Sequence, residues 1–145
     1  MFVKRGYHRH YDSGKGGLNN WLLDVEMGYL LAPMRTGIRL TTGVELAPLE
    51  ADPDERQLEA AERMARGVLP LGKRLEATAW LGARPCCADM KPIIGPAPRH
   101  SGLWLACGHG YQGFTLGPAT GRLLAELMDD ESPAIGMAPF AATRF

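Results

Sequence analysis

The sequence predicts an α+β fold with a mostly antiparallel sheet and two helices. Residues 7–49 favour extended structure and are interrupted by Gly, Pro, Asn and Ser clusters, a pattern typical of an antiparallel meander. Residues 52–66 and 118–128 instead place apolar side chains at helical spacing. These observations indicate a sheet that is completed by two helices.

Length and composition describe an ordinary globular chain. It has 145 residues, of which 46% are hydrophobic and 22% are charged, so we expect one domain with a real core. Lys plus Arg equals Asp plus Glu at 16 each. Because these charges are interspersed, there is no basic stripe, and nucleic acid is not an expected partner.

Targeting and metal-binding signals are absent from the sequence. The apolar stretches are far shorter than the roughly 20 residues of a membrane span, and the N-terminus does not resemble a secretory signal. The cytoplasm is therefore the expected compartment. Three cysteines, two of them adjacent, and four scattered histidines do not match a disulfide framework or a zinc site.

In the first half of the chain we expect four strands and one helix. Gly43 is expected to mark a bulge or a close backbone contact. Asp52 is the expected N-cap of a helix that ends near Arg66. The strands are predicted at Tyr7–Tyr11, Trp21–Val25, Tyr29–Ala32 and Ile38–Leu46. On the helix, Leu58, Ala61, Ala65 and Val68 are expected to face inward, and Glu59, Glu62 and Arg63 outward.

The second half is predicted to contain three strands, two loops and one helix. The expected strands are Leu75–Gly82, a short buried segment at Ile93–Gly95, and a buried strand at Leu103–Cys107. Loops are expected at residues 83–92 and 108–117, followed by a helix at Pro118–Met128 with Leu123, Leu124 and Leu127 inward. The tail after Pro133 is expected to be extended.

A glycine motif follows the last predicted strand. Gly108, Gly110 and Gly113 match the G-x-G-x-x-G pattern of dinucleotide-binding folds. However, the predicted helix at Pro118 begins too late for that motif, and no second strand with a ribose-binding acid follows. The glycines are therefore better interpreted together with the segments around them.

Five sequence blocks occur in a fixed order around this motif. They are Trp80-x-Gly82-x-Arg84-Pro85, Asp89-x-x-Pro92-Ile93-Ile94-Gly95, Gly108-His109-Gly110-x-x-Gly113-x-Thr115, Pro118-Ala119-Thr120-Gly121, and Pro139-Phe140 with Arg144-Phe145. Together they resemble the C-terminal portion of the D-amino-acid oxidase and dehydrogenase family, nearest in pattern to D-amino-acid dehydrogenase and glycine oxidase. Residues 7–49 resemble the family more loosely.

The resemblance implies a chain that forms only part of a flavoenzyme. No N-terminal Rossmann-type unit for the ADP half of FAD is present, so we expect a single partial domain. Residues 1–82 would supply the sheet and helix of the substrate domain. Residues 83–145 would supply the substrate and flavin loop, a strand, the glycine loop and the C-terminal helix that completes a flavin site. The FAD is expected to be non-covalent.

The resemblance also implies the site residues. Arg84 matches the arginine that binds the substrate carboxylate, and a planar guanidinium suits that role. Tyr29 matches a tyrosine that bonds the same carboxylate in some members, although a strand tyrosine in the core is equally compatible with the sequence. The expected cofactor-binding residues are Gly108, His109, Gly110, Gly113, Phe114 and Thr115. For His109, a structural loop contact is the favoured alternative.

The predicted activity is FAD-dependent oxidation of the C–N bond of an amino acid, such as a D-amino acid or a glycine-like amine, by hydride transfer to flavin. The alternative is a non-catalytic fragment or interaction subunit that completes a pocket on a separate flavin-binding chain. The expected partners are a small amino-acid substrate and either a complementing flavin-binding chain or a second copy of this chain.

Overall fold

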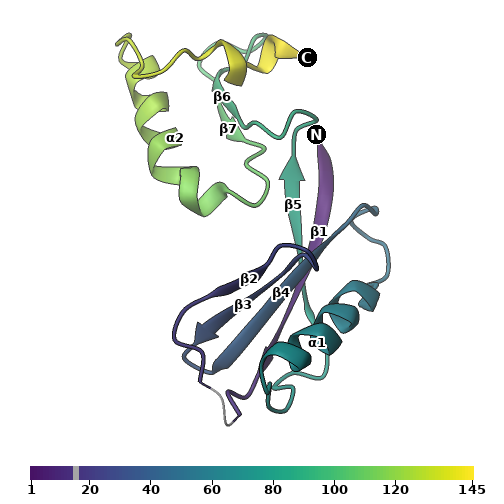
Figure 1. Cartoon of the computed structure of the whole chain (residues 1–145). Helices are drawn as coiled ribbons and strands as arrows, with labels where there is room; N and C mark the ends of the chain where they lie inside the picture. The colour runs from purple at the N-terminus through teal and green to yellow at the C-terminus, as the bar shows by residue number, and fades with distance from the viewer. Residues whose placement is uncertain (15–16) are drawn as a thin grey trace. The chain divides into compact units, whose positions relative to one another are not determined.

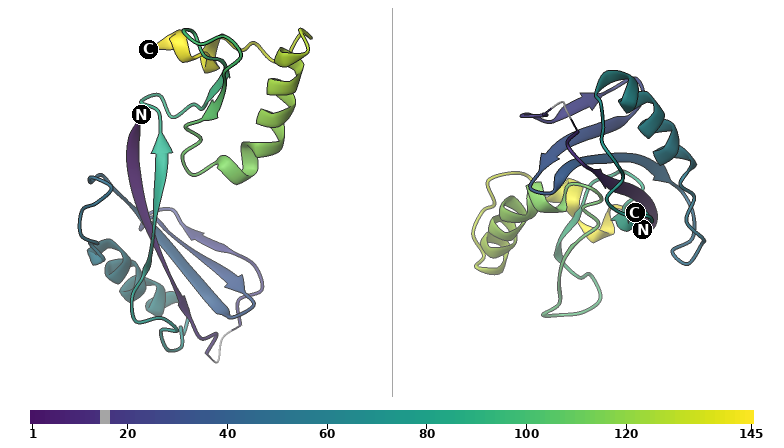
Figure 2. Two further views of the ribbon diagram at one scale, coloured as in Figure 1. Left: turned by 180° about the vertical axis from the view of Figure 1, so that it is seen from behind. Right: turned by 90° about the horizontal axis from the view of Figure 1, so that it is seen from below.

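The computed structural model describes residues 1–14 and 17–145, and its strands form two sheets (Figures 1 and 2). The larger sheet has the strand order β2-β3-β4-β1-β5, and β6 pairs with β7. The pairs β1/β4, β2/β3, β3/β4 and β6/β7 are antiparallel, which confirms the predicted α+β class. The elements are β1 Phe2–Tyr11, β2 Leu22–Asp24, β3 Tyr29–Met34, β4 Gly37–Glu45, α1 Arg56–Val68, β5 Trp80–Cys86, β6 Ile93–Pro96, β7 Trp104–Cys107, α2 Gly113–Met128, and the 3-10 turns η1 Ala138–Phe140 and η2 Ala142–Arg144.

The chain divides into two compact units. The sheet unit comprises residues 5–83, and the C-terminal unit comprises residues 1–4 and 84–145. The sheet unit contains most of the large sheet together with α1. The C-terminal unit contains β6, β7, α2 and the two 3-10 turns, while β1 and β5 have residues in both units.

The core of the sheet unit lies between one face of the large sheet and α1. Helix α1 packs next to β4 (Figure 2). Because successive strand residues point to opposite faces, every second side chain of β1, β3 and β4 faces the helix. The buried core consists of Tyr7, Tyr11, Tyr29, Leu31, Ile38, Leu40, Leu58, Ala61, Ala65 and Leu71.

The four strands expected in the first half are present, and Gly43 lies at an irregularity in their ladder. Arg5 pairs with Glu45 but Tyr7 pairs with Thr42, so β4 contains an extra residue there. Gly43 has φ +85°, and a Cβ at this position would lie 2.5 Å from Oε1 of Gln57. A positive φ and a close neighbour both favour glycine. The expected bulge is therefore present, and the close neighbour is a side chain rather than the backbone that was the other expectation.

The predicted strand Leu75–Gly82 is shifted in the structure. Strand β5 begins at Trp80 and continues to Cys86, into the segment predicted as a loop. Around the segment before Trp80, carboxylates accept hydrogen bonds from backbone N–H groups. Glu76 accepts the His10 N–H at 2.9 Å, and Glu55 accepts the Ala79 N–H at 3.0 Å.

Helix α1 begins three residues later than predicted, with its N-cap at Glu55 rather than at Asp52. Its first residue is Arg56, and its N-cap Glu55 makes no side-chain capping bond. The segment before it is fixed in a non-helical path by Arg5, whose guanidinium donates to the carbonyls of Pro48, Ala51 and Asp52 at 3.0, 2.6 and 3.2 Å. Sequence cannot reveal this because Arg5 is distant along the chain.

Two side chains of α1 face the opposite way from the prediction. Leu58, Ala61 and Ala65 are buried as expected. Val68, however, is 59% exposed, because it is the last residue of the helix. Glu62, expected outward, is only 6% exposed. A charged residue is buried only when it is paired, so Glu62 must have partners inside the sheet unit.

Glu62 is the centre of a buried hydrogen-bond network. It accepts hydrogen bonds from Tyr11 at 2.8 Å, Arg66 at 2.9 Å and Arg74 at 2.8 Å. The guanidinium of Arg9 lies 3.8 Å away and also pairs with Glu55. Burial raises the pKa of Glu62, but the bonds from Arg74, Tyr11 and Arg66 outweigh burial and hold that pKa below 4.5. The network joins α1 to β1 and to the segment after the helix.

We predict that Glu62→Gln lowers the free energy of unfolding by about 3 kcal/mol at pH 7, because it leaves the buried Arg9 with weaker compensation. The folded pKa of Glu62 is depressed, so its stabilisation is present above pH 4.5 and is lost as pH falls through the folded value. Urea unfolding of both proteins from pH 7 to pH 3 measures this difference.

The matched control is Glu59→Gln, which removes an exposed carboxylate from the same helix. It should change stability by less than about 0.5 kcal/mol. Equal effects of the two substitutions would contradict a special role for Glu62.

Candidate functional site

The glycine loop connects β7 to α2 and is anchored to the end of β5. The Gly110 N–H donates to the Pro85 carbonyl at 2.9 Å, and Cys86 and His109 form an isolated β-bridge. Gly108 and Gly110 have φ values of +76° and +58°, which glycine adopts without steric cost. The predicted cofactor loop is thus joined to the strand that carries Arg84.

Two buried thiols lie directly beneath this loop. Cys86 is 0% exposed and Cys87 is 1% exposed. A Cβ on Gly108 would lie 2.6 Å from the sulfur of Cys87, and a Cβ on Gly110 would lie 3.2 Å from that of Cys86. The glycines are therefore required both by backbone conformation and by the packing of the loop. All three cysteines are free.

Helix α2 starts at Gly113, one turn before the predicted start at Pro118. Proline removes only its own N–H bond, and the ladder already begins with Leu116 N–H donating to the Gln112 carbonyl at 2.8 Å. On the inner side, Leu123 is buried and Leu124 and Leu127 are half-buried. The positive end of the helix dipole therefore lies at the glycine loop, closer to it than the sequence predicted.

The first turn of α2 offers three backbone donors. The N–H groups of Gly113, Phe114 and Thr115 have no acceptor within the helix, and the N-cap Gln112 makes no side-chain capping bond. All three residues are exposed, and the Phe114 side chain is 100% exposed. Donors of this kind can bind the carbonyl and ring-nitrogen edge of a flavin, so the residues present fit that group.

The side chain of His109 is directed to the helix. Its Nε2 lies 2.9 Å from Oγ1 of Thr120, which is 6% exposed. This contact joins the loop to the second turn of α2 and supports the structural alternative for His109. The hydroxyl contact of Thr120 depends on a loop conformation that sequence spacing alone does not reveal.

The two predicted carboxylate ligands belong to different units. Arg84 is half-buried on β5 in the C-terminal unit, on a strand where a loop was predicted. Tyr29 is on β3 in the sheet unit and is 1% exposed within its core. Burial raises the pKa of the Tyr29 phenol, and the nearby Asp24 carboxylate adds to that shift. A substrate role for either residue stays a prediction.

The segment after β5 is held by the chain's C-terminal turn. Arg144 donates to Asp89 at 2.9 and 3.1 Å and to the Lys91 carbonyl at 2.7 Å. The hydrogen bonds from Arg144 lower the pKa of Asp89 to about 2. The tail after Pro133 was predicted to be extended, but residues 138–144 instead form the turns η1 and η2.

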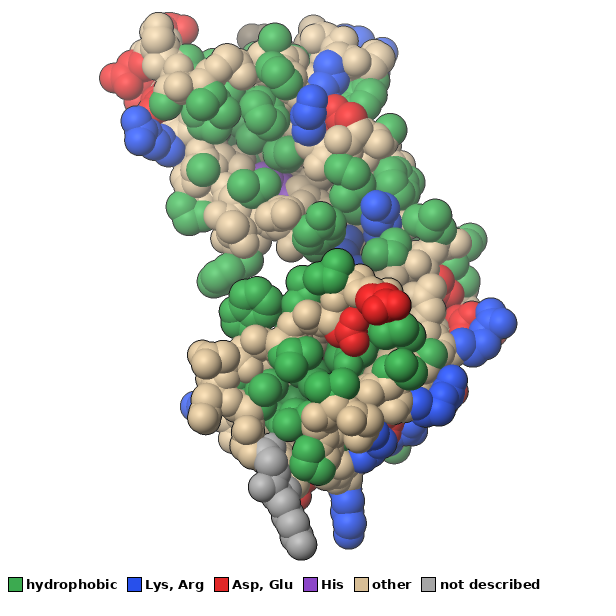
Figure 3. Space-filling view, in the orientation of Figure 1, with side chains coloured by type: hydrophobic (Ala, Val, Ile, Leu, Met, Phe, Trp, Pro, Cys, Tyr) green, Lys and Arg blue, Asp and Glu red, His purple; other side chains and the backbone are tan. Residues whose placement is uncertain are grey.

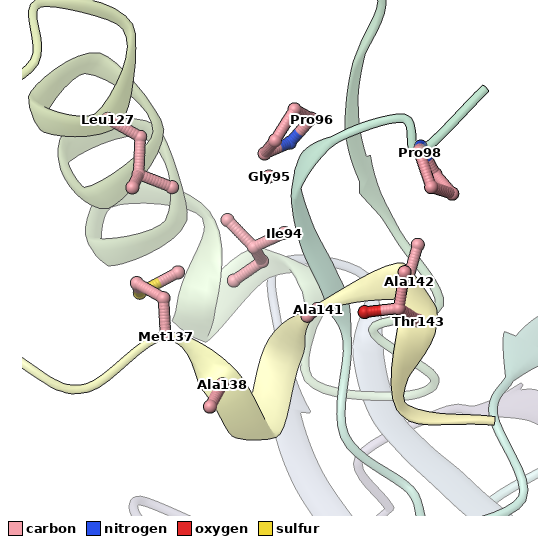
Figure 4. A pocket seen from close by; sticks show the side chains of 10 residues that line it. All are labelled: Ile94, Gly95, Pro96, Pro98, Leu127, Met137, Ala138, Ala141, Ala142 and Thr143. Carbon is pink, nitrogen blue, oxygen red and sulfur yellow. The ribbon is translucent and has the colours of Figure 1, made fainter. Parts of the chain in front are cut away.

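Those turns close an apolar pocket of about 290 Å³ against β6 and α2. Figure 4 shows Leu127, Met137 and Ile94 at one end of it and Pro98, Ala142 and Thr143 at the other. No predicted site residue lines this pocket. The segment Leu103–Cys107 is also less buried than predicted, since Leu103 is 47% exposed and none of the residues of β7 is fully buried.

Neither metal binding nor membrane insertion is indicated by the described part of the chain. Within residues 1–14 and 17–145, no three His, Cys, Asp or Glu side chains gather as metal ligands. No helix in that part has the length and apolar character needed to span a bilayer.

Comparison with known proteins gives consistent matches. The family model described as FAD dependent oxidoreductase matches residues 1–127. A D-amino-acid oxidase from Bradyrhizobium diazoefficiens is 32% identical over 99% of this chain and 35% of its own length. A glycine oxidase from Pseudomonas aeruginosa is 36% identical over 79% of this chain and 32% of its own length.

The fold of this chain is also found within an enzyme whose structure has been solved. Glycine oxidase from Geobacillus kaustophilus superposes with a TM-score of 0.82 at 23% identity, covering all of this chain and 40% of that chain. The chain therefore spans about a third of the length of the curated relatives that it matches.

We predict that Gly108→Ala destabilises the fold by about 1–3 kcal/mol, because the new Cβ meets the Cys87 sulfur at a positive φ. Thermal unfolding followed by circular dichroism measures this change. Adding Cys87→Ala should remove the clash with the sulfur and so recover part of the lost stability. The cost of a positive φ at a residue other than glycine should remain.

Gly121→Ala is the matched control on α2, where an added Cβ has no neighbour within 4 Å. This substitution should raise stability by up to about 1 kcal/mol. A Gly108→Ala protein as stable as the wild type would show that the loop does not require glycine there.

Proposed function

Because the chain belongs to the family of FAD-dependent oxidoreductases, we propose that it forms the substrate-binding and flavin-contacting part of an enzyme that oxidises the C–N bond of an amino acid. The proposed substrates are D-amino acids or glycine-like amines. In this proposal the sheet unit is the substrate domain, and the C-terminal unit supplies the contact with the flavin ring.

The observation that carries the proposal is the glycine loop that ends in the exposed first turn of α2. Its three N–H donors, at Gly113, Phe114 and Thr115, would bind the pyrimidine edge of the isoalloxazine ring. That edge becomes anionic on reduction, and the positive end of α2 would stabilise it. Gly108 and Gly110 would allow the planar ring to approach the backbone, because they carry no side chain.

The loop would act as a preorganised surface. Preorganised donors contribute most when they do not have to reorganise during the reaction. Here the Gly110 N–H bond to Pro85, the His109 contact with Thr120 and the buried thiols all fix the loop from behind. The donors at the start of α2 therefore have a defined direction before any ligand binds.

Arg84 would bind the substrate carboxylate through two parallel hydrogen bonds and so orient the α-carbon. We propose Tyr29 as a second donor to that carboxylate. Because Tyr29 is buried in the core, its substitution can separate a substrate-binding role from a structural one. Loss of a purely structural tyrosine would lower stability and leave the kinetic constants unchanged.

The proposed reaction requires little acid–base catalysis from the residues of this chain. FAD, when bound, supplies the acceptor for a hydride from the α-carbon. The amino group loses a proton and the substrate becomes an imino acid, which water converts to a keto acid and ammonia. The chain's residues would bind the carboxylate, align the C–H bond and exclude water.

The exposed aromatic residues of the loop suggest a further partner surface. Phe114 is 100% and Tyr111 65% exposed, and Figure 3 shows hydrophobic side chains at the surface of both units. We propose that Phe114 and Tyr111 contact the flavin or the polypeptide that holds its ADP half. In isolation, the chain is expected to associate with itself through them.

We predict that Arg84→Ala in the flavin-loaded enzyme lowers kcat/KM about thirtyfold to several-thousandfold, as expected for the loss of a buried charge-assisted pair worth about 2–5 kcal/mol. Flavin content, measured by visible absorption, should not change. Arg84→Lys should recover little activity, since a point charge does not reproduce a planar two-bond contact.

Arg99→Ala, an exposed arginine in the turn between β6 and β7, is the control and should leave kcat/KM unchanged. An amine substrate that lacks the carboxylate should be poor for the wild type and insensitive to Arg84→Ala. Loss of flavin or of folding, with normal kinetics in the remaining fraction, would assign Arg84 a structural role instead.

A further inference from the structure

The face of the large sheet opposite α1 carries a cluster of polar and aromatic side chains. Tyr7, Arg9 and Tyr11 face the helix, so the alternation of β1 places His8 and His10 on the other face. Arg39 of β4 pairs with His10 across the ladder and shares that face. All of these residues belong to the sheet unit.

A chain of hydrogen bonds fixes Arg39. Its Nε donates to Nε2 of His10 at 3.0 Å, and Nδ1 of His10 lies 2.7 Å from Oε1 of Glu76. Because arginine can only donate, Nε2 of His10 must accept. The proton of this ring is then on Nδ1 and is donated to Glu76. His10 is therefore held in one tautomer as a neutral link between the two charges.

This arrangement leaves the end of the Arg39 guanidinium available. Within residues 1–14 and 17–145, its two Nη groups donate no hydrogen bond. Glu76 orients the guanidinium through the imidazole but does not pair with it directly. A planar fork held at Nε and open at both Nη groups matches the geometry of a carboxylate.

An aromatic surface lies beside this fork. The rings of His8 and Trp80 are stacked, with centroids 4.6 Å apart and an interplanar angle of 21°, and His8 meets the edge of His10 at 5.2 Å. Trp80 is 56% exposed. Burial lowers the pKa of His8, the charge of Arg39 adds to this shift, and the Glu76 carboxylate acts in the opposite direction.

We propose that Arg39, with the His8–Trp80 stack, forms a subsite for the side chain of a substrate that carries a second carboxylate, as in a dicarboxylic amino acid. The fork binds the side-chain carboxylate and the indole covers the methylene groups. This proposal rests on the proposed amino-acid oxidation and narrows its substrate class.

The test compares D-glutamate with D-glutamine, which has the same shape but a neutral side chain. Each is titrated into the 145-residue chain while NMR follows the ring signals of His8 and Trp80. D-Glutamate should bind about tenfold to a hundredfold more tightly than D-glutamine, as expected for one charge-assisted contact. It should also raise the titration midpoint of His8, because an anion then lies beside that ring.

Arg39→Gln should remove this preference, whereas Arg35→Gln, in the exposed turn between β3 and β4, should retain it. Because Arg39→Gln could disturb His10, Trp80→Ala provides a second variant that keeps every charge of the cluster. It should weaken binding of both ligands and preserve the preference. Equal binding of the two ligands by the wild type, or an unchanged preference in Arg39→Gln, would overturn the subsite.

Activity of the flavin-loaded enzyme separates the two proposals. A kcat/KM for D-glutamate above that for D-glutamine, lost in Arg39→Gln, supports both. Selective binding without any amino-acid oxidation retains the subsite and removes the proposed function. Oxidation of both amino acids with equal kcat/KM retains the function and overturns the subsite.

Discussion

The buried pairing of Arg9 with Glu55 and Glu62 is the interaction on which the rest of the sheet unit depends. Arg9 is 1% exposed in the middle of β1, so its charge requires compensation where it lies. Both carboxylates come from the start and the middle of α1, which fixes the position of the helix over the sheet. Glu55 also accepts the Ala79 N–H, so the same network is joined to the residue just before β5.

Strand β5 contributes to the candidate site at its C-terminal end. Strand β5 carries Arg84 and ends at Cys86, which pairs with His109 and lies under Gly110. The glycine loop is therefore anchored to the end of β5. The same loop precedes the first turn of α2, where the unpaired N–H groups are found.

The sequence predicted the parts of the fold that depend on local pattern. The antiparallel meander, Leu58, Ala61 and Ala65 in the core, the irregularity at Gly43 and membership of the flavoenzyme family are all confirmed. The errors arise where a distant residue overrides the local pattern. Glu62 was expected outward because helical periodicity treats every carboxylate as solvated.

The errors near the candidate site have similar physical causes. Pro118 was taken as the first residue of α2, whereas only the hydrogen-bond ladder shows that the helix begins at Gly113. Arg84 was placed in the loop predicted at residues 83–92, although this segment contains Pro85. Proline is compatible with a strand at the edge of a sheet, which is the position of β5. The roles of Arg84 and Tyr29 depend on a bound substrate, so neither pattern nor fold determines them.

The distribution of charge provides the last constraint on function. The formal net charge is zero, so the chain generates little long-range field to attract an anionic substrate. Three of its charged side chains, Arg5, Arg9 and Glu62, are buried inside the sheet unit. Recognition of a carboxylate must then rely on individual guanidinium groups at close range. A planar group fixed by one bond and open at its end, as Arg39 is, meets that requirement, because its direction is set before the ligand arrives.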